Sequence, residues 1–492
     1  MTAHPAPQND QFQLILVSRS TKRVLVERQS VLEFDSGFSL PQISVPKWTR
    51  WALHIQQAIK QRWNLQSVVL DVLGERSRGG RIAIAEAIDD QAISPISGHF
   101  ALLPLGEIPH FEIEDADDSL RIALQDLLDG KTNPHAPFLQ LGWTNELLQW
   151  IPTVISTDRI DIDDEIEQFN ASSSHALLKI RSRRGPSLWF KAVAEPILES
   201  AGHEYVATTV LSNLFPEYLP RLLAIRADWK GWLMNDAGLP IEESDPLEIE
   251  IADMIGTRLA EMQRASVLQV DTLLRHGFID QRIPALRDAM LGMMPYFEDA
   301  VLSQRSAAAP TIEIGRLKEI AEIFEDVCLD LEETEIPDTV VHNDLKTGNI
   351  LIGNGSCVFT DWAQAGVGNP LVALDQLQQY LAQNQRLGSW VPLIVRSYRE
   401  HWRSRIADVQ FDRALRSIRL LSIVTHLASR RHWFMSRDCY KTGLESYIRS
   451  LLRQMDTAAQ SLQCEDLSEV ICERCVPHDT SFRQSRYSIR RG

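Results

Sequence analysis

The stretch VVHNDLKTGNILI, residues 340–352, sets a group of polar side chains between two short apolar runs. Asp344 lies near its centre, and Asn349 follows five residues later. A carboxylate and an amide oxygen on one short loop can face the same reaction centre, where Asp344 orients an acceptor hydroxyl and takes its proton while Asn349 reaches a metal ion. The competing interpretation is a polar surface turn, in which both residues only shape the chain.

A second acidic position follows this loop. Asp361, twelve residues after Asn349, stands in VFTDWAQAG, where Val358 and Phe359 are expected to end a strand and Asp361 to lead off it. Carboxylate and amide oxygens are ligands that Mg²⁺ prefers. We therefore expect Asn349 and Asp361 to bind Mg²⁺ from two loops that a short hairpin joins. His342 is expected to brace the loop through hydrogen bonds rather than to act as a base.

Taken together, VVHNDLKTGNILI and VFTDWAQAGVGNPLVALDQL resemble the aminoglycoside phosphotransferase and choline kinase-like family, the small-molecule branch of the protein-kinase-like fold. The family pattern is H-G-D, then N-I-L, then I-D-W and a later Asp, so Asn343 stands where the family has Gly. The later Asp matches Asp375, which the resemblance implies braces the catalytic loop. The resemblance also implies ATP and Mg²⁺ as cofactors and a small-molecule hydroxyl as acceptor.

The upstream strands fit the same resemblance. It implies a strand Lys that holds the nucleotide phosphates and pairs with a helix Glu, and Lys191 in LWFKAV and Glu204 in GHEYVATTV match in type and order. Glu195 and Glu199 are rival partners, and a solvated strand edge is the plainer interpretation of Lys191. The run GWLMNDAG fits the hinge, where backbone groups near Met234 and Asn235 would hold the adenine edge.

The predicted phosphate loop departs from the family. The aligned run NASSSH, residues 170–175, has no Gly. Ser172, Ser173 and Ser174 can still offer N–H and O–H donors to phosphate, but the close backbone approach that Gly permits is lost. Two functions therefore stay open: an ATP-dependent phosphotransferase, and a non-catalytic nucleotide-binding or scaffold protein with a kinase-like fold.

The whole chain sets broad limits. Its 492 residues are too many for one core, and its net charge of -16 argues against a general nucleic-acid binder. No run approaches the roughly 18 apolar residues of a membrane helix, so no membrane partner is expected. The scattered cysteines do not form a disulfide framework, which favours a cytoplasmic location.

The sequence predicts an α+β chain with a bilobal protein-kinase-like fold, strand-rich first and helical after. Residues 165–460 form this phosphotransferase domain. A small α+β domain of unknown role precedes it at residues 10–150, with strands and a helix that are weakly Nudix-like in layout. Its helix, residues 47–63, has no Asp or Glu, so the carboxylates of a Nudix hydrolase are missing. The acid-rich segment 150–168 is expected to be a solvated connector.

The remaining segments carry less information. Residues 461–492 are expected to be a disordered tail. It holds a C-x-x-C motif and could ligate zinc, although one close pair is a weak signal; the candidate ligands are Cys464, Cys472, Cys475 and His478. The acid-rich segment 241–261 could suit a cationic acceptor, and the Arg-rich segment 386–437 could suit an anionic one. Solvated helix faces explain both segments better than a substrate site does.

Overall fold

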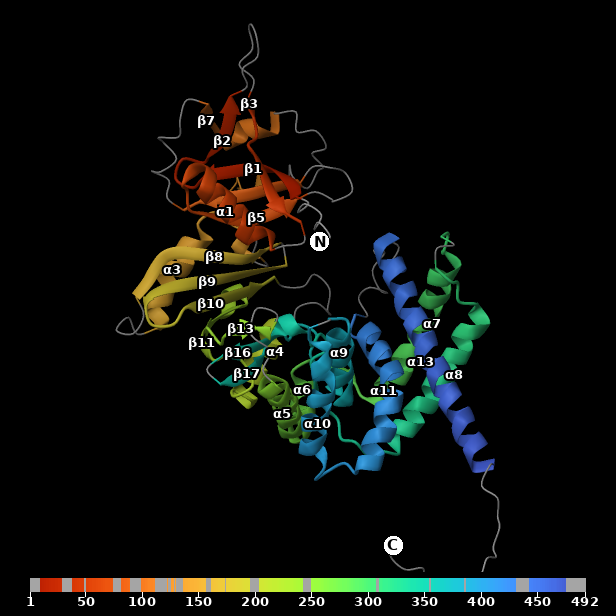
Figure 1. Ribbon diagram of the computed structural model, residues 1–492. Coiled ribbons are helices and arrows are strands. Elements are labelled where there is room, and N and C mark those ends of the chain that lie inside the picture. Colours follow the sequence, from red (N-terminus) through yellow and green to blue (C-terminus); the bar gives the residue numbers. More distant parts are fainter. Residues whose placement is uncertain are drawn as a thin grey trace, which may run out of the picture.

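The computed structural model describes most of the chain and leaves the remaining positions aside. The described residues are 9–28, 38–47, 50–73, 81–88, 99–110, 122, 125–127, 129, 136–155, 161–172, 174–194, 203–241, 249–306, 309–353, 355–384, 386–430 and 442–474. Figure 1 shows a strand-rich N-terminal unit, a second strand-rich layer beneath it, and a helical lobe below both.

The N-terminal unit is a mixed sheet with one helix packed on it. Strand β1 (Asn9–Ser18) runs parallel to β6 and antiparallel to β2 and β4. Helix α1 (Trp51–Trp63) buries Ile55 and Ile59 against the sheet. The other strands of this sheet are β2 (Arg23–Arg28), β3 (Phe38–Ser39), β4 (Gln42–Pro46), β5 (Ser67–Leu73), β6 (Arg81–Ala87) and β7 (Phe100–Pro104). The predicted helix is therefore confirmed from Trp51 onward.

The second layer is a five-stranded antiparallel sheet in the order β11-β12-β10-β9-β8. The strands are β8 (Asp161–Ala171), β9 (His175–Arg184), β10 (Leu188–Val193), β11 (Leu222–Arg226) and β12 (Gly231–Asn235). Helix α4 (His203–Leu214) follows β10, where the sequence predicts it. This sheet and α4 form the smaller lobe of the predicted bilobal kinase-like fold.

The predicted solvated connector over residues 150–168 is wrong. Its first part belongs to helix α3 (Trp143–Val154), which buries Leu147 and Ile151, and its last part forms strand β8. Along β8, Ile166 and Gln168 are buried, whereas Glu167 between them pairs with Arg181. This alternation is the signature of a strand at a half-buried sheet, and a count of acidic residues does not detect it.

The larger lobe is helical and starts after β12. Its helices are α5 (Ile249–Ser266), α6 (Val270–Arg275), α7 (Ile283–Leu302), α8 (Ile314–Glu332), α9 (Leu371–Ala382), α10 (Val391–Trp402), α11 (Asp408–Ala428) and α13 (Thr442–Arg474). Its short strands are β13 (Leu239–Pro240), β14 (Ile279–Gln281), β15 (Thr339–Val341), β16 (Ile350–Gly353), β17 (Ser356–Phe359) and β18 (Gly366–Gly368). The fold is thus α+β and bilobal, as the sequence predicts.

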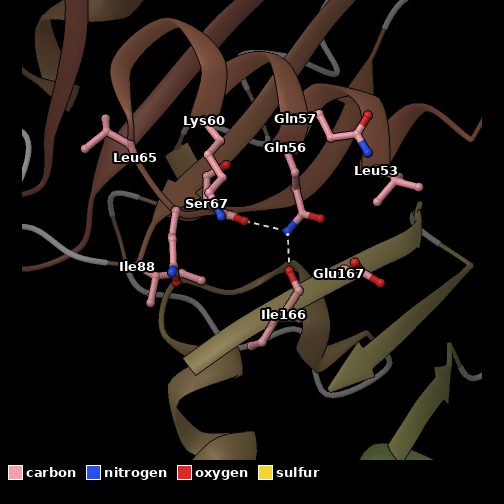
Figure 2. Close-up of a pocket in the computed structure, with 10 residues that line it drawn as sticks. Leu53, Gln56, Gln57, Lys60, Leu65, Ser67, Ile88, Ile166 and Glu167 are labelled. Carbon is pink, nitrogen blue, oxygen red and sulfur yellow. Dashed lines mark hydrogen bonds between the residues drawn. The ribbon is translucent and has the colours of Figure 1, made fainter. Parts of the chain in front are cut away.

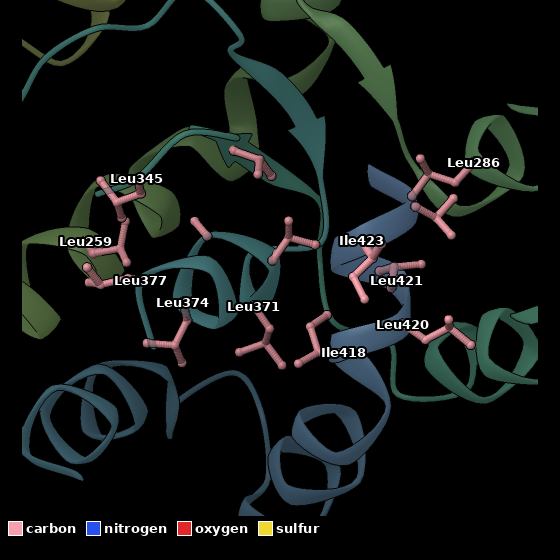
Figure 3. Close-up of a cluster of buried hydrophobic side chains, with 14 of the residues drawn as sticks. Leu259, Leu286, Leu345, Leu371, Leu374, Leu377, Ile418, Leu420, Leu421 and Ile423 are labelled. Atoms are coloured by element: carbon pink, nitrogen blue, oxygen red, sulfur yellow. The ribbon is translucent and has the colours of Figure 1, made fainter. Parts of the chain in front are cut away.

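One apolar cluster unites this lobe and reaches the loop on which the sequence centres. Leu345 lies in that loop and packs in the same cluster as Leu259 of α5 and Leu377 of α9 (Figure 3). Fully burying a leucine side chain contributes about 1.5–3 kcal/mol, so this anchor fixes the loop against the helices.

The predicted tail from residue 461 is also corrected. Helix α13 continues to Arg474, because Leu462 packs on the core of the larger lobe and both Asp456 and Gln463 bond Arg316 of α8. Residues 475–492, which include Cys475 and His478, lie outside the described part of the chain, and so does the side chain of Cys472. In the described part, no helix is long and apolar enough to cross a bilayer.

Candidate active site

The loop between β15 and β16 holds Asp344 and Asn349 together. The Asn349 side-chain N–H donates to the Asp344 carbonyl oxygen at 2.9 Å, and its Nδ2 lies 3.5 Å from the Asp344 carboxylate. A short 3₁₀ turn, Thr347–Asn349, brings the two residues to this geometry. Lys346 Nζ lies 2.8 Å from the same carboxylate. Asp344 stays about one-third exposed, so it is accessible to a second substrate.

The β16–β17 hairpin brings Asp361 to this loop. Ile350 pairs with Phe359 in the hairpin, and the Thr360 N–H donates to the Asn349 carbonyl oxygen at 3.0 Å. Asp361 follows Thr360 with a φ of 69°, a backbone conformation that non-glycine residues rarely adopt. Asn349 and Asp361 line the same cavity.

His342 supports the loop from behind. Its Nε2 lies 2.9 Å from the Thr360 carbonyl oxygen, which fits an N–H donor, and its Nδ1 accepts from the Asp344 N–H at 3.4 Å. Burial lowers the pKa of His342, so the imidazole is neutral, as this pair of hydrogen bonds requires. Its ring also packs on Trp362, with centroids 4.4 Å apart. These contacts fit the predicted bracing role.

Asn343 occupies the position where the family pattern has Gly, and the backbone explains why. Its φ is 62°, in the left-handed region that Gly enters freely and Asn tolerates better than most residues. The side chain is buried and donates to Gln281 Oε1 at 2.6 Å and to the Gln364 carbonyl oxygen at 2.8 Å. Asn343 therefore keeps the backbone conformation and adds two buried hydrogen bonds.

Lys191 links the two lobes. It is buried on β10, forms an ion pair with Glu204 of α4, and lies 3.2 Å from the Asp361 carboxylate. Burial alone would lower the pKa of Lys191, but the carboxylates of Glu204 and Asp361 raise it, so the side chain is an ammonium ion. Lys191 in turn lowers the pKa of Asp361 to about 2. The geometry selects Glu204 as the partner; Glu195 and Glu199 lie outside the described residues.

A cavity of about 460 Å³ runs between the lobes beside these groups. Lys191, Met234 and Asn235 line it from the smaller lobe, and Asn349 and Asp361 line it from the larger lobe. Within the described part of the chain, the Asn235 Oδ1 atom is buried and accepts no hydrogen bond. Since a buried acceptor left unpaired costs about 1–3 kcal/mol, an N–H donor of a bound molecule would stabilise this atom.

The loop between β8 and β9 is ordered by its own hydroxyl. Ser172 Oγ accepts from the N–H groups of Ser174 and His175, each at 3.3 Å. These donors therefore point into the loop, and the cavity is lined here by Asn170 and His175 instead of Ser172 or Ser174. Burial, and then Lys191, lower the pKa of His175 to about 4, so it is neutral near pH 7. Ser173 lies outside the described residues.

Two further predictions can be placed. Asp375 is buried, and its carboxylate bonds Arg419 of α11 at 3.1 Å and Gln379 at 3.4 Å, so it ties α9 to α11. In the described part of the chain, no group of three or more His, Cys, Asp or Glu side chains is placed to hold a metal ion. The Asn349 and Asp361 pair stays the candidate, because an amide oxygen can also ligate a metal ion. Cys464 is exposed as a free thiol.

Sequence reasoning missed several cavity residues. The rings of Phe169 on β8 and Trp189 on β10 pack together, with centroids 4.7 Å apart and planes tilted by 51°, and both residues line the cavity. Trp189 lies two residues before Lys191 on the same strand, so its side chain was predictable on the Lys191 face. Arg50, from the N-terminal unit, also lines the cavity, and no local pattern marks it.

Comparisons with known proteins find a match over the segment that contains Asp344. Residues 237–407 match the sequence model of the phosphotransferase enzyme family, which covers the loop of Asp344, the β16–β17 hairpin and Asp375. The predicted resemblance is therefore confirmed over this segment. A search of curated proteins finds no match.

Solved structures also align with the chain at low identity. A macrolide 2'-phosphotransferase from Brachybacterium faecium is 13% identical, with 63% of this chain and 97% of that one covered and a TM-score of 0.42. An ethanolamine kinase from Plasmodium vivax is 14% identical, with 71% and 96% covered and a TM-score of 0.44. A choline kinase from Cryptosporidium parvum is 13% identical, with 68% and 98% covered and a TM-score of 0.43.

Proposed function

We propose that this chain transfers the γ-phosphoryl group of ATP to a hydroxyl group of a small molecule. One observation carries the proposal: a continuous chain of contacts links Asp344 to Asn349, Asn349 to Asp361 through Thr360, and Asp361 to Lys191. These are the acceptor-orienting carboxylate, the two hard oxygen ligands and the phosphate-binding cation that phosphoryl transfer requires. The family match over residues 237–407 supports the same reaction class.

Each residue then has a defined task. Lys191, fixed by Glu204, binds the phosphates of ATP. The polar end of Asn235 and the Met234 backbone hold the adenine edge, which satisfies the orphaned Asn235 Oδ1 atom. Asp344 orients the acceptor hydroxyl in line with the γ-phosphorus and accepts its proton as the new O–P bond forms and the bond to ADP breaks.

The donor set of Asn349 and Asp361 fits Mg²⁺, since both offer oxygen and Asp361 is ionised at any working pH. Bound there, Mg²⁺ neutralises charge on the phosphates. Lys346 lies beside the Asp344 carboxylate and adds a cation on the acceptor side.

The test is ATP turnover against a panel of sugars, amino alcohols and aminoglycosides. The wild type is expected to release ADP only when its acceptor is present, and Asp344→Ala is expected to lose about 10²–10⁴-fold of that rate. Asp408→Ala removes a similar charge from the exposed first turn of α11 and is expected to keep full activity. ATP binding without turnover on any acceptor would favour the non-catalytic scaffold instead.

A further inference from the structure

The N-terminal unit is fastened to the smaller lobe through two buried glutamines. Gln56 of α1 donates to the carbonyl oxygens of Ser67 and Ile166, at 2.6 and 3.3 Å (Figure 2). The Gln56 side-chain oxygen also accepts from the Gln168 N–H at 2.7 Å. Gln168 in turn bonds both the N–H and the carbonyl of Val69 at 2.7 Å. All of these hydrogen bonds except the one to Ser67 join the N-terminal unit to β8. The two glutamine side chains therefore pair with backbone groups at the edges of β8 and β5, where each sheet has no further strand.

Apolar packing joins the same two units. A single buried cluster contains Val68 and Ile84 of the N-terminal sheet, Leu147 of α3, and Leu178 and Phe190 of the second sheet. Because β8 leads directly into the predicted phosphate loop, the N-terminal unit holds this strand and its loop in place. Rigid support of this kind positions any residue that the unit extends toward the cleft.

Arg50 is such a residue. It directly precedes α1, where its neighbour Trp51 packs against Phe12, with centroids 6.2 Å apart, and beneath Arg81 at 4.5 Å. The Arg50 guanidinium lies 5.1 Å from the centroid of Phe169, and Arg50 lines the cavity between the lobes. Anchored on one side and stacked on the other, it faces the cleft from outside the kinase-like fold.

The charges around the cleft indicate that Arg50 is available to bind an anion. The chain carries a net charge of -16, which disfavours an anionic ligand, and the N–H groups of the loop after β8 point to Ser172. Lys179, the neighbouring cation of the cavity wall, pairs with Asp236 at 2.9 Å. Among the described residues, no carboxylate pairs with Arg50, and its contact is the face of Phe169. A guanidinium stacked in this way keeps its N–H edge available for an anion.

We propose that Arg50 of the N-terminal unit binds the phosphates of the nucleotide. It supplies a cation from outside the kinase-like fold, where the glycine-free loop directs its N–H groups to Ser172 instead of the cavity. The inference rests on the proposed function insofar as ATP is the ligand. It gives the N-terminal unit a role in that site: the unit completes the nucleotide cleft.

Calorimetric titration of the full chain with MgATP and with adenosine tests this. Arg50→Ala is expected to weaken MgATP binding roughly tenfold, as for the loss of a charge-assisted hydrogen bond, and to change adenosine binding little. The MgATP difference from the wild type is expected to shrink at high salt, because an exposed charge is screened. Arg50→Lys is expected to recover part of the affinity. Arg23→Ala, which removes the same charge from an exposed position on β2, serves as the control and is expected to bind MgATP like the wild type.

Unchanged MgATP affinity in Arg50→Ala, an equal loss for adenosine, or an equal loss in Arg23→Ala would each overturn the proposal. Binding of MgATP without turnover, with the Arg50 effect intact, would reject the proposed reaction while this inference stands. A wild type that binds no MgATP would overturn both. Unchanged melting temperatures among the variants would exclude misfolding as the cause of a loss.

Discussion

Replacing Asn343 separates the contribution of its left-handed backbone conformation from that of its buried hydrogen bonds. Asn343→Gly keeps the backbone free to hold a φ of 62° but removes the hydrogen bonds to Gln281 and to the Gln364 carbonyl. Each buried acceptor left unpaired costs about 1–3 kcal/mol, but the loss of the buried, unpaired Asn343 Oδ1 atom offsets part of this. We expect Asn343→Gly to lower the free energy of unfolding by about 2 kcal/mol.

Asn343→Ala adds the cost of the backbone. A left-handed conformation costs an ordinary residue about 1–2 kcal/mol, and alanine recovers about 0.4–1 kcal/mol relative to glycine through its less flexible unfolded chain. Alanine is therefore expected to be about 1 kcal/mol worse than glycine at this position. Urea denaturation followed by tryptophan fluorescence measures both differences.

Asn64 provides the matched control. It ends α1 with a φ of 54°, and its side chain is exposed. Asn64→Ala is expected to show the same backbone cost of about 1 kcal/mol, whereas Asn64→Gly is expected to be nearly neutral. If Asn343→Gly were also neutral, the buried hydrogen bonds would contribute nothing. If alanine and glycine were equal at residue 343, the backbone reasoning would be refuted.

Three further outcomes follow from the ion pairs and the glutamine contacts. Gln56→Leu leaves buried partners unpaired and is expected to destabilise the N-terminal unit by about 2–4 kcal/mol, measured by hydrogen exchange in β5 and β8; unchanged exchange would contradict the account. The lowered pKa of Asp361 means that its ionised form stabilises the fold above its unfolded pKa, near 4, and that this contribution is lost as the pH falls toward 2; Asp361→Asn is expected to flatten acid unfolding in that window. Glu204→Gln removes the charge that fixes Lys191, so we expect KM for ATP to rise severalfold with the acceptor KM unchanged, and a rise in the acceptor KM alone would reject the pairing.

The loop of Asp344 was predictable because its signal is local. Asp344 and Asn349 directly precede the β16–β17 hairpin and Asp361 follows it, so spacing along the chain fixes their spacing in the fold. The Lys191–Glu204 pair was predictable for a similar reason, since a strand and the next helix pack together. The rest depends on contacts distant in sequence. The contact between Asp375 and Arg419 of α11 is of this kind, since no residue near Asp375 in the sequence indicates it.

Charge counting misled the prediction in two places. The acidic residues of β8 suggested a solvated linker, but the buried Ile166 and Gln168 alternate with them and face the N-terminal unit. The polar end of α13 suggested a tail, but Gln463 is held by Arg316 across the lobe. Arg50 could not be found from the sequence, since its position at the cleft arises only when two sheets dock.

The most direct test of the central claim is detection of the phosphorylated acceptor by phosphorus NMR. The pooled panel is incubated with MgATP and either the wild type or Asp344→Ala. The account predicts a new phosphomonoester signal that grows with ADP in the wild type and falls at least about 10²-fold in the variant. An equal rate of phosphomonoester formation in both proteins would contradict the role of Asp344 and the site built around it.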